Sequence, residues 1–255
     1  MPRIFNLDGK VALITGGATG IGRALAVEFA RHGCSVIINY NESCAEAKET
    51  LKEVMAFKTR ALICQADVTQ ESQVKKMVEE TIAFAGKIDI LVNNAGTMVE
   101  RRKIVDFDLD LWRKVMDINF TSVFLVSKYV AKAMIIQGYG KIINISSVAA
   151  RTGGGPGAVA YASAKGAVHT FTKGLAKELA PYGILVNAIA PGVIMTRFHE
   201  QHSSKQVLEN FRKNIPVGRI GDPQEIAGAA LLLATNYGSY MTGEMIEVNG
   251  GMLMD

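Results

Sequence analysis

The sequence has 255 residues, of which 49% are hydrophobic and 20% charged, and its formal net charge is +4. This length allows one large domain, and this balance is typical of a soluble globular protein. The densest basic run, at 101–103, contains no aromatic residue, which favours a solvated loop over a nucleic-acid contact. Three scattered cysteines argue against a disulfide framework or a metal site.

The N-terminal segment lacks the apolar stretch of a secretory signal. No uninterrupted apolar run approaches the length of a transmembrane helix. We therefore expect a cytoplasmic protein that has no membrane partner.

Seven nearly continuous apolar segments predict buried strands. They cover residues 10–15, 34–40, 60–65, 88–94, 140–146, 184–190 and 244–248. The segments between them have helical patterns, such as 22–32 and 71–85, and a further helix begins at Asp222 with Pro223 and Glu225. The alternation predicts an α/β single-domain Rossmann fold over 1–255, with a doubly wound, mostly parallel seven-stranded sheet and helices on both faces.

A glycine-rich loop follows the first predicted strand, with the sequence Thr-Gly-Gly-Ala-Thr-Gly-Ile-Gly at 15–22. Gly16, Gly20 and Gly22 would let the backbone turn sharply and approach a pyrophosphate, which the N-terminus of the next helix would attract. The alternative is a tight turn whose glycines serve packing only. The position inside a strand-helix-strand unit favours the dinucleotide site.

Tyr161 and Lys165 lie four residues apart in a helical segment of small residues, so they share one face. A free tyrosine has a pKa near ~10 and is a poor base at neutral pH. A nearby ammonium stabilises the phenolate and lowers that pKa, which predicts an acid/base pair. An amphipathic helix that carries these two residues by chance is the alternative.

Several motifs occur in a characteristic order: the glycine loop with its TGxxxGxG spacing, Asn-Asn-Ala-Gly at 93–96, Ile-Ser-Ser at 145–147, the Tyr161–Lys165 pair, and Pro-Gly at 191–192. Together they resemble the short-chain dehydrogenase/reductase family, from about residue 8 to residue 251. The resemblance implies an enzyme that moves a hydride between NAD(P) and a ketone or secondary alcohol. Within the family, the sequence is most similar in appearance to the 3-oxoacyl-[acyl-carrier-protein] reductases.

The resemblance also assigns roles to residues. Tyr161 would be the acid/base, Lys165 would hold the nicotinamide ribose, Ser147 would bond the reacting oxygen, and Asn119 would support a proton-relay water. The residues expected to bind the cofactor are these two and Gly16, Thr19, Gly20, Ile21, Gly22, Tyr40, Asn41, Asp67, Val68, Asn93, Ala95, Gly96, Pro191, Gly192, Ile194 and Thr196. Asp67 is alternatively a turn or cap residue, and Asn93 alternatively satisfies groups between strands.

The spacing from Ser147 to Tyr161 is one residue longer than in many family members. The extra residue is expected in the loop at 153–158, near the substrate mouth. The segment at about 193–215 is expected to form a substrate lid. Its polar residues Arg197, His199, Glu200 and His202 suit either a hydroxylated or anionic substrate or a solvated face.

The residues after the second predicted strand bear on the choice of nucleotide. A carboxylate at the end of this strand favours NAD, because it repels a 2′-phosphate. Here Tyr40 and Asn41 precede the first carboxylate, Glu42, and Thr19 stands where NADP enzymes often have a basic residue. The sequence thus leans slightly to NADP, with use of NAD also expected.

Three functions remain open at this stage. The first is a 3-oxoacyl reductase, which would need basic residues for an acidic acyl-carrier protein; Lys177 matches one such position, but Gly138 stands at the other. The second is a sugar or polyol dehydrogenase of the glucose-dehydrogenase type. The third is a catalytically silent nucleotide-binding regulatory protein. The resemblance further implies a homotetramer.

Overall fold

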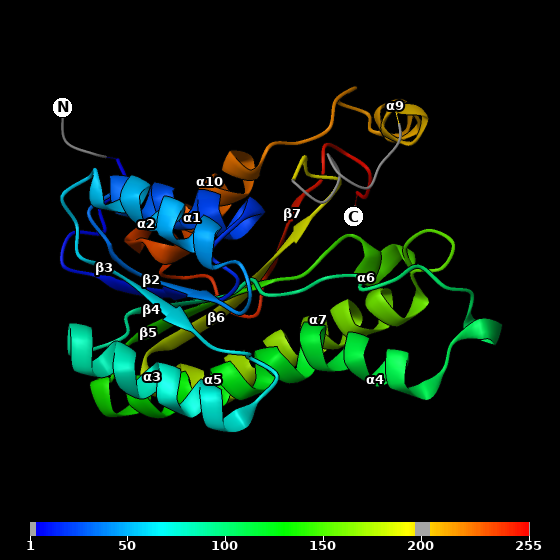
Figure 1. Ribbon diagram of the computed structural model, residues 1–255. Coiled ribbons are helices and arrows are strands. Elements are labelled where there is room, and N and C mark those ends of the chain that lie inside the picture. Colours follow the sequence, from blue (N-terminus) through cyan, green and yellow to red (C-terminus); the bar gives the residue numbers. More distant parts are fainter. Residues whose placement is uncertain (1–3, 197–204, 255) are drawn as a thin grey trace.

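The computed structural model describes residues 4–196 and 205–254. Their centre is a seven-stranded sheet with the order β3-β2-β1-β4-β5-β6-β7, in which every neighbouring pair is parallel (Figure 1). The strands are β1 (Val11–Ile14), β2 (Ser35–Tyr40), β3 (Ala61–Gln65), β4 (Ile90–Asn93), β5 (Gly140–Ile145), β6 (Ile184–Pro191) and β7 (Met245–Val248).

The structure confirms all seven predicted strands, and no boundary differs by more than two residues. The predicted sheet was mostly parallel, and the observed one is parallel throughout. Continuous apolar runs made the strands recognisable because both faces of a parallel sheet are covered. The strand order reverses direction between β1 and β4, which is the point where doubly wound sheets bind ligands.

Helices cover both faces of the sheet (Figure 1). On one face lie α1 (Gly20–Arg31), α2 (Cys44–Met55) and α10 (Pro223–Ala234), and on the other lie α3 (Glu71–Ala85), α5 (Ser122–Gln137) and α7 (Val159–Leu179). The predicted start of α10 is confirmed, since the Glu225 carboxylate accepts a hydrogen bond of 2.8 Å from the backbone N–H of Asp222. Shorter elements complete the described part: α4 (Leu109–Met116), α6 (Ala149–Thr152), α9 (Lys205–Asn214), the 3₁₀ turns η1 (Ile104–Asp106), η3 (Ala180–Tyr182) and η4 (Asn236–Gly238), and the π-helical turn η2 (Asp117–Thr121).

The sheet divides the apolar core into two layers. Ile14 of β1 packs with Phe29 of α1 on one side, while Leu13 packs with Met134 of α5 on the other, and all four side chains are fully buried. Truncation of such residues to alanine typically costs about 2–5 kcal/mol. The two layers hold the strand ends rigidly, and the site is built on those ends.

The helical stretch Leu109–Gln137 is long and apolar enough, by length and composition alone, to cross a membrane. Half of its most apolar window is buried inside the protein, and its α5 portion packs against β4, β5 and α3. A core helix of this kind meets the same criterion, so we interpret the stretch as part of the α/β core.

Candidate active site

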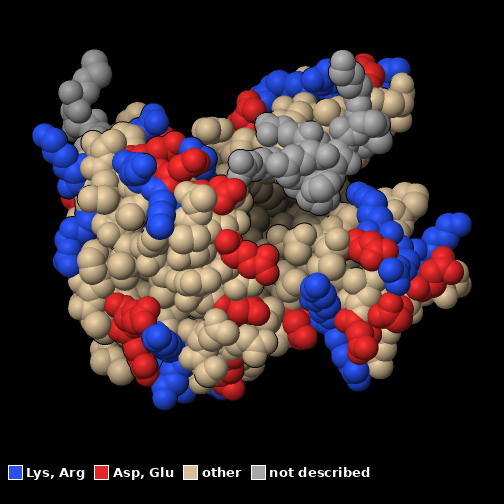
Figure 2. All heavy atoms as spheres, viewed as in Figure 1, with Lys and Arg blue, Asp and Glu red and all other residues tan. Residues whose placement is uncertain are grey.

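A large cavity of about 1420 Å³ opens along the carboxyl ends of the strands (Figure 2). It runs from the glycine loop after β1, past the ends of β2 and β3, to the start of α7. Single small-molecule pockets measure about 300–1,000 Å³, so this cavity has room for a dinucleotide together with a substrate.

The glycine loop forms one end of the cavity. Gly16 and Gly20 have φ angles of +60° and +54°, a region that residues with a Cβ rarely adopt. Gly22 packs so closely on the backbone of Gly16 that a Cβ would also come within 2.6 Å of the Asn94 amide. This loop leads directly into α1, whose first residues Gly20 and Ile21 line the cavity, so the positive end of the helix lies where an anion site requires it.

The end of β4 is tied to the glycine loop. The Asn94 side-chain amide donates to the carbonyls of Thr15 and Gly16, at 2.9 and 3.1 Å. The Thr15 hydroxyl in turn accepts from the backbone N–H groups of Asn94 and Ala95, at 3.0 and 3.1 Å. These bonds fix the position of the loop relative to the residues that follow β4.

At the end of β2, Tyr40 is buried against Ala18 and Ala47, and its hydroxyl donates to the Cys44 sulfur at 3.6 Å. Asn41 is exposed and lines the cavity beside it. After β3, the Asp67 carboxylate accepts from the N–H and hydroxyl of Thr69, at 2.9 and 2.8 Å, and also lines the cavity. Asp67 is therefore a turn residue that also lies where it can contact a ligand in the cavity.

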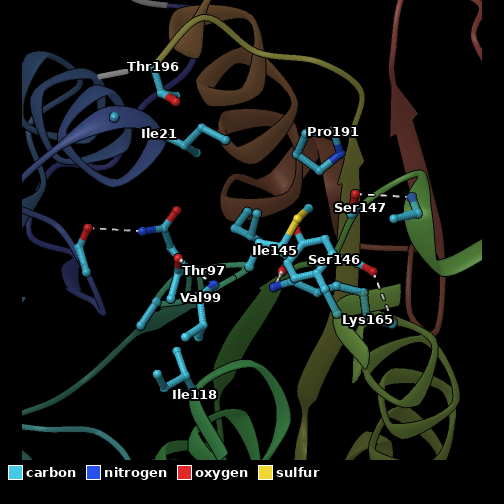
Figure 3. A pocket seen from close by; sticks show the side chains of 18 of the residues that line it. Ile21, Thr97, Val99, Ile118, Ile145, Ser146, Ser147, Lys165, Pro191 and Thr196 are labelled. Carbon is cyan, nitrogen blue, oxygen red and sulfur yellow. Dashed lines mark hydrogen bonds between the residues drawn. The ribbon is translucent and has the colours of Figure 1, made fainter. Parts of the chain in front are cut away.

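Tyr161 and Lys165 of α7 line the other end of the cavity together with Ser147, which follows β5. Figure 3 shows Ser147 and Lys165 there. The Lys165 ammonium lies 5.8 Å from the centroid of the Tyr161 ring and donates a 2.8 Å hydrogen bond to the carbonyl of Ile145. Burial raises the pKa of Tyr161, which the hydrogen bond with Ser147 partly offsets. Burial lowers the pKa of Lys165 to about 8. The structure thus differs from the predicted lowering of the tyrosine pKa, because burial is the largest influence on it.

Asn119 lies behind this group, in the π-helical turn η2 between α4 and α5. Its side-chain amide exchanges two hydrogen bonds with the backbone of Thr97, at 3.1 and 2.7 Å, and donates a third to Val115 at 2.8 Å. Gly96 separates it from the lysine: a Cβ there would lie 2.8 Å from the Asn119 oxygen and 3.2 Å from the Lys165 nitrogen. Single π turns in helices are frequent at functional sites.

The far wall follows β6. Gly192 lies against Asn249, where a Cβ would approach the Asn249 Cα to 2.7 Å, and Ile194 forms a parallel bridge with Gly221. Phe211 and Asn214 of α9 line the cavity, and the lid at about 193–215 stays a prediction. Arg197, His199, Glu200 and His202, also placed in that lid, lie outside the described residues.

Most residues predicted to bind the cofactor line this one cavity, as do Ser147, Tyr161 and Lys165. Three predicted site residues do not. Gly22 faces the loop backbone, Asn119 is buried behind Gly96, and the Asn93 amide donates to Ser127 and Asn144 at 2.9 Å each. Asn93 therefore ties β4 to β5 and α5, because alternate residues of a strand point to opposite sides.

Comparisons with known proteins agree with this geometry. A family model described as enoyl-(acyl carrier protein) reductase matches residues 16–253. A 3-oxoacyl-[acyl-carrier-protein] reductase of Synechocystis is 41% identical over 253 residues, covering 97% of this chain and 98% of that protein. A short-chain type dehydrogenase/reductase from Mycobacterium marinum superposes with a TM-score of 0.94 at 37% identity, covering 99% of this chain and 98% of the other.

The chain belongs to the short-chain dehydrogenase/reductase family. It is an oxidoreductase of hydroxyl and keto groups. Two further relatives show the range of the family. The 2-dehydro-3-deoxy-D-gluconate 5-dehydrogenase of Dickeya dadantii is 42% identical over 255 residues, covering 98% of this chain and 97% of that protein. The structure of a 7α-hydroxysteroid dehydrogenase complexed with NADH and 7-oxo glycochenodeoxycholic acid has a TM-score of 0.92 at 33% identity, covering 98% and 96%.

The sequence did not single out every residue that shapes the cavity. Asn94 anchors the glycine loop, and Thr97, Val99 and Ile118 form the wall opposite Ser147 (Figure 3). Asn94 follows the predicted Asn93, and consecutive strand residues point to opposite sides. Knowing the register of the strand would therefore have identified Asn94 as the residue that faces the glycine loop. The position of Val99 and Ile118 in this wall depends on the tertiary fold, and no local sequence pattern indicates it.

Proposed function

We propose that this short-chain dehydrogenase/reductase transfers a hydride between NADP or NAD and a ketone or secondary alcohol, with 3-oxoacyl compounds as the leading substrates. The observation that carries the proposal is the convergence of Ser147, Tyr161 and Lys165 at one end of a cavity whose other end is a glycine loop. Such an arrangement puts a proton donor and a phosphate cradle at the two ends of one elongated site.

The fit of a dinucleotide rests on the glycine loop. The left-handed Gly16 and Gly20 leave the backbone open to a pyrophosphate, and Thr19 and Ile21 line the same end. The residues proposed to hold the cofactor elsewhere are Tyr40, Asn41, Asp67, Val68, Ala95, Gly96, Tyr161, Lys165, Pro191, Gly192, Ile194 and Thr196. When bound, the nicotinamide accepts a hydride from an alcohol or gives one to a ketone.

The protein's own residues would handle the proton. In reduction, the Tyr161 hydroxyl gives its proton to the ketone oxygen, while Ser147 donates a hydrogen bond to the same oxygen. In oxidation, the Tyr161 phenolate takes the proton of the alcohol. Lys165 is anchored on Ile145 and stabilises the phenolate by its charge. Asn119, with both polar atoms bonded to Thr97, positions the backbone beside Gly96.

The choice of nucleotide is proposed to be a weak preference for NADP with use of NAD. Tyr40 carries no charge and is buried, which removes the carboxylate that would repel a 2′-phosphate. Glu42 lines the cavity nearby and opposes a strong preference. Activity ratios with the two nucleotides test this directly.

A second substrate class, a sugar acid or polyol, is favoured by one observation. A patch for an acidic carrier protein is incomplete, because Gly138 ends α5 without a charge and the nearby Lys141 is buried with its ammonium on the Thr235 carbonyl. Of the two lysines, Lys177 is the one whose charge is exposed to solvent. The 42% identical relative from Dickeya dadantii, named as acting on a sugar acid, makes this class the alternative to test.

The decisive experiment is a substrate panel with both nucleotides, run on the wild type and on Tyr161→Phe. The phenylalanine ring still packs but cannot transfer a proton, so we expect turnover to fall by at least a thousandfold with nucleotide affinity retained. Retained activity within about tenfold, or ~1.4 kcal/mol of barrier, excludes Tyr161 as the acid/base. Nucleotide binding without turnover of any panel member would support the silent regulatory alternative.

Assembly and location remain proposals. Sedimentation tests the homotetramer that the family resemblance implies, and cell fractionation tests the cytoplasmic location.

A further inference from the structure

We propose that Arg101 selects substrates that carry a carboxylate group. This inference rests on the proposed function and deepens it by naming the chemical class of the substrate. Arg101 belongs to the segment after β4 and lines the cavity. The proposal depends on how this side chain is held, what it is not paired with, and where it lies.

Two loops from distant parts of the chain join at the rim of the cavity. The Arg102 backbone N–H donates to the Gly157 carbonyl at 3.2 Å, and the Arg101 guanidinium donates through Nη1 to the Pro156 carbonyl at 3.1 Å. Gly157 has a φ of +77°, and a Cβ there would lie 3.0 Å from the Arg102 nitrogen, so the close approach requires glycine. The joint fixes the guanidinium over the loop at 153–158.

This second loop leads to the reacting groups. It follows α6, which begins two residues after Ser147, and it ends at α7, which carries Tyr161. Gly154 lies against Ala158, where a Cβ would approach the Ala158 methyl group to 2.9 Å. Gly154 and Gly155 both line the cavity, and the Arg101 nitrogen is 3.7 Å from the Cβ position of Gly155. Arg101 is thus placed at the substrate end of the cavity.

The guanidinium retains donors for a ligand. Within residues 4–196 and 205–254, no carboxylate pairs with Arg101, and no hydrogen bond uses its Nη2 or Nε. These two atoms form the planar edge that binds a carboxylate with two parallel hydrogen bonds. The neighbouring Arg102 differs, because Glu100 and Asp108 bind it at 2.8 and 2.9 Å.

Two other basic residues belong to the described part of the rim, and one of them is paired with a carboxylate. Arg113 and Lys114 line the cavity from α4, together with Asp110 of α4 and Asp117 of η2. Arg113 contacts Asp110 at 3.4 Å, whereas Lys114 makes no ion pair with any described residue. Figure 2 shows basic side chains grouped beside the hollow, with acidic side chains among them. Within the described residues, Arg101 is the unpaired rim cation that is held on the loop leading to Tyr161.

The segment that carries Arg101 begins with a strained turn. Val99 has a φ of +61°, and the Met98 carbonyl accepts from the Glu100 N–H at 2.7 Å across it. This is a γ-turn of the rare kind that has a positive φ. Holding a β-branched residue in this conformation costs of order 1–3 kcal/mol of stability. Backbone strain of this kind persists mainly where a site requires it. Here it reverses the chain so that residues 100–103 reach the second loop.

The test compares acids with their esters. We would measure kcat/KM for 3-oxobutanoate and 4-oxopentanoate and for the methyl ester of each, with both nucleotides. A charge-assisted, exposed contact of this kind corresponds to about a tenfold effect. We expect the wild type to prefer the acids, and Arg101→Gln to lower kcat/KM for the acids about tenfold and for the esters less than threefold. Arg101→Lys should restore part of the preference.

Arg102→Gln is the matched control, since it removes the same charge one residue away from a side chain that is already paired. It should leave the acid-to-ester ratio unchanged. An equal loss on acids and esters, an equal effect of Arg102→Gln, or a wild-type preference for the esters would overturn the inference. So would an effect of Arg101→Gln confined to a carrier-bound substrate, because Arg101 would then contact the carrier.

A binding measurement separates this inference from the proposed chemistry. Calorimetry of 4-oxopentanoate with the Tyr161→Phe protein, saturated with nucleotide, does not depend on turnover. We expect the Kd to rise about tenfold when Arg101→Gln is added. An unchanged Kd, or no binding of 4-oxopentanoate at all, overturns the role of Arg101 even if the enzyme is active. A different outcome would separate the two proposals: Arg101→Gln weakens binding of the acid, but the wild type reduces no ketone. That result would support the role of Arg101 and count against the proposed function alone.

Discussion

Gly96 lies between two side chains of the site that cannot easily move, and Gly96→Ala tests whether their placement matters. Its φ lies outside the left-handed region, so alanine meets no backbone penalty there. The added methyl group would lie 2.8 Å from the Asn119 oxygen and 3.2 Å from the Lys165 nitrogen. Contacts below 3.0 Å essentially do not occur for real Cβ atoms, so one of the three groups must shift.

The size of the effect follows from what holds those groups. Asn119 is bonded at both side-chain atoms to Thr97 and also to Val115, and Lys165 is bonded to Ile145. Overpacking in such surroundings costs about 1–3 kcal/mol. For a chain of this length the Tm should fall by about 2–4 °C per kcal/mol. Displacement of a positioned group by part of an ångström should lower kcat by ~10- to 100-fold.

The assay is thermal unfolding together with steady-state kinetics on the best substrate of the panel. Gly174→Ala is the control, because Gly174 is an exposed residue of α7, the helix of Lys165, and a Cβ there meets nothing within 4 Å. That substitution should raise stability by about 0.5–1 kcal/mol and leave kcat unchanged. Wild-type Tm and kcat in Gly96→Ala would refute the view that Asn119 and Lys165 are rigidly placed.

Three further substitutions probe charge. Lys165→Met should weaken nucleotide binding and move the pH profile of alcohol oxidation upward, because the charge that favours the Tyr161 phenolate is lost; an unchanged profile removes that role. Asn41→Asp should shift the ratio of kcat/KM toward NAD, and a constant ratio would place this residue away from the ribose. The pKa of Lys141 is lowered by burial to about 8 in the folded protein, against ~10.4 unfolded, so its contribution to stability rises with pH through this window. Urea unfolding at pH 7.5 and 9.5 should show the wild type gaining about 2 kcal/mol relative to Lys141→Met, and an equal difference at both pH values contradicts this.

The sequence was a good guide to elements and a weaker guide to side-chain direction. Buried strands have uniform apolar runs, so β1 to β7 were recognisable, and α3 was predicted at its observed bounds. Asn93 and Asn94 were different, because a motif of adjacent polar residues does not say which one faces the ligand. The pleat of β4 directs Asn93 toward Asn144 and leaves Asn94 for the glycine loop.

Other features depend on contacts between distant segments. Tyr40 was predicted at the nucleotide, but its ring packs against Ala47 of α2, so the exposed Asn41 is the better position for changing the preference. The joint between Arg101 and Pro156 spans 55 residues and involves a loop whose length alone was noticed in the sequence. No local pattern records such a contact, since it forms only when the ends of β4 and β5 are placed side by side.

Burial affects the reacting pair more than their mutual attraction does, and this has a chemical consequence. The pKa of Tyr161 is raised and that of Lys165 is lowered to about 8, both because burial favours the neutral form. The raised pKa keeps Tyr161 protonated at neutral pH, which is the state that the proposed donation of a proton to a ketone oxygen requires. Reduction should need no prior deprotonation, whereas oxidation must first form the phenolate. With Tyr161 in its proposed role, we therefore expect reduction to be favoured near pH 7 and oxidation to gain as the pH rises.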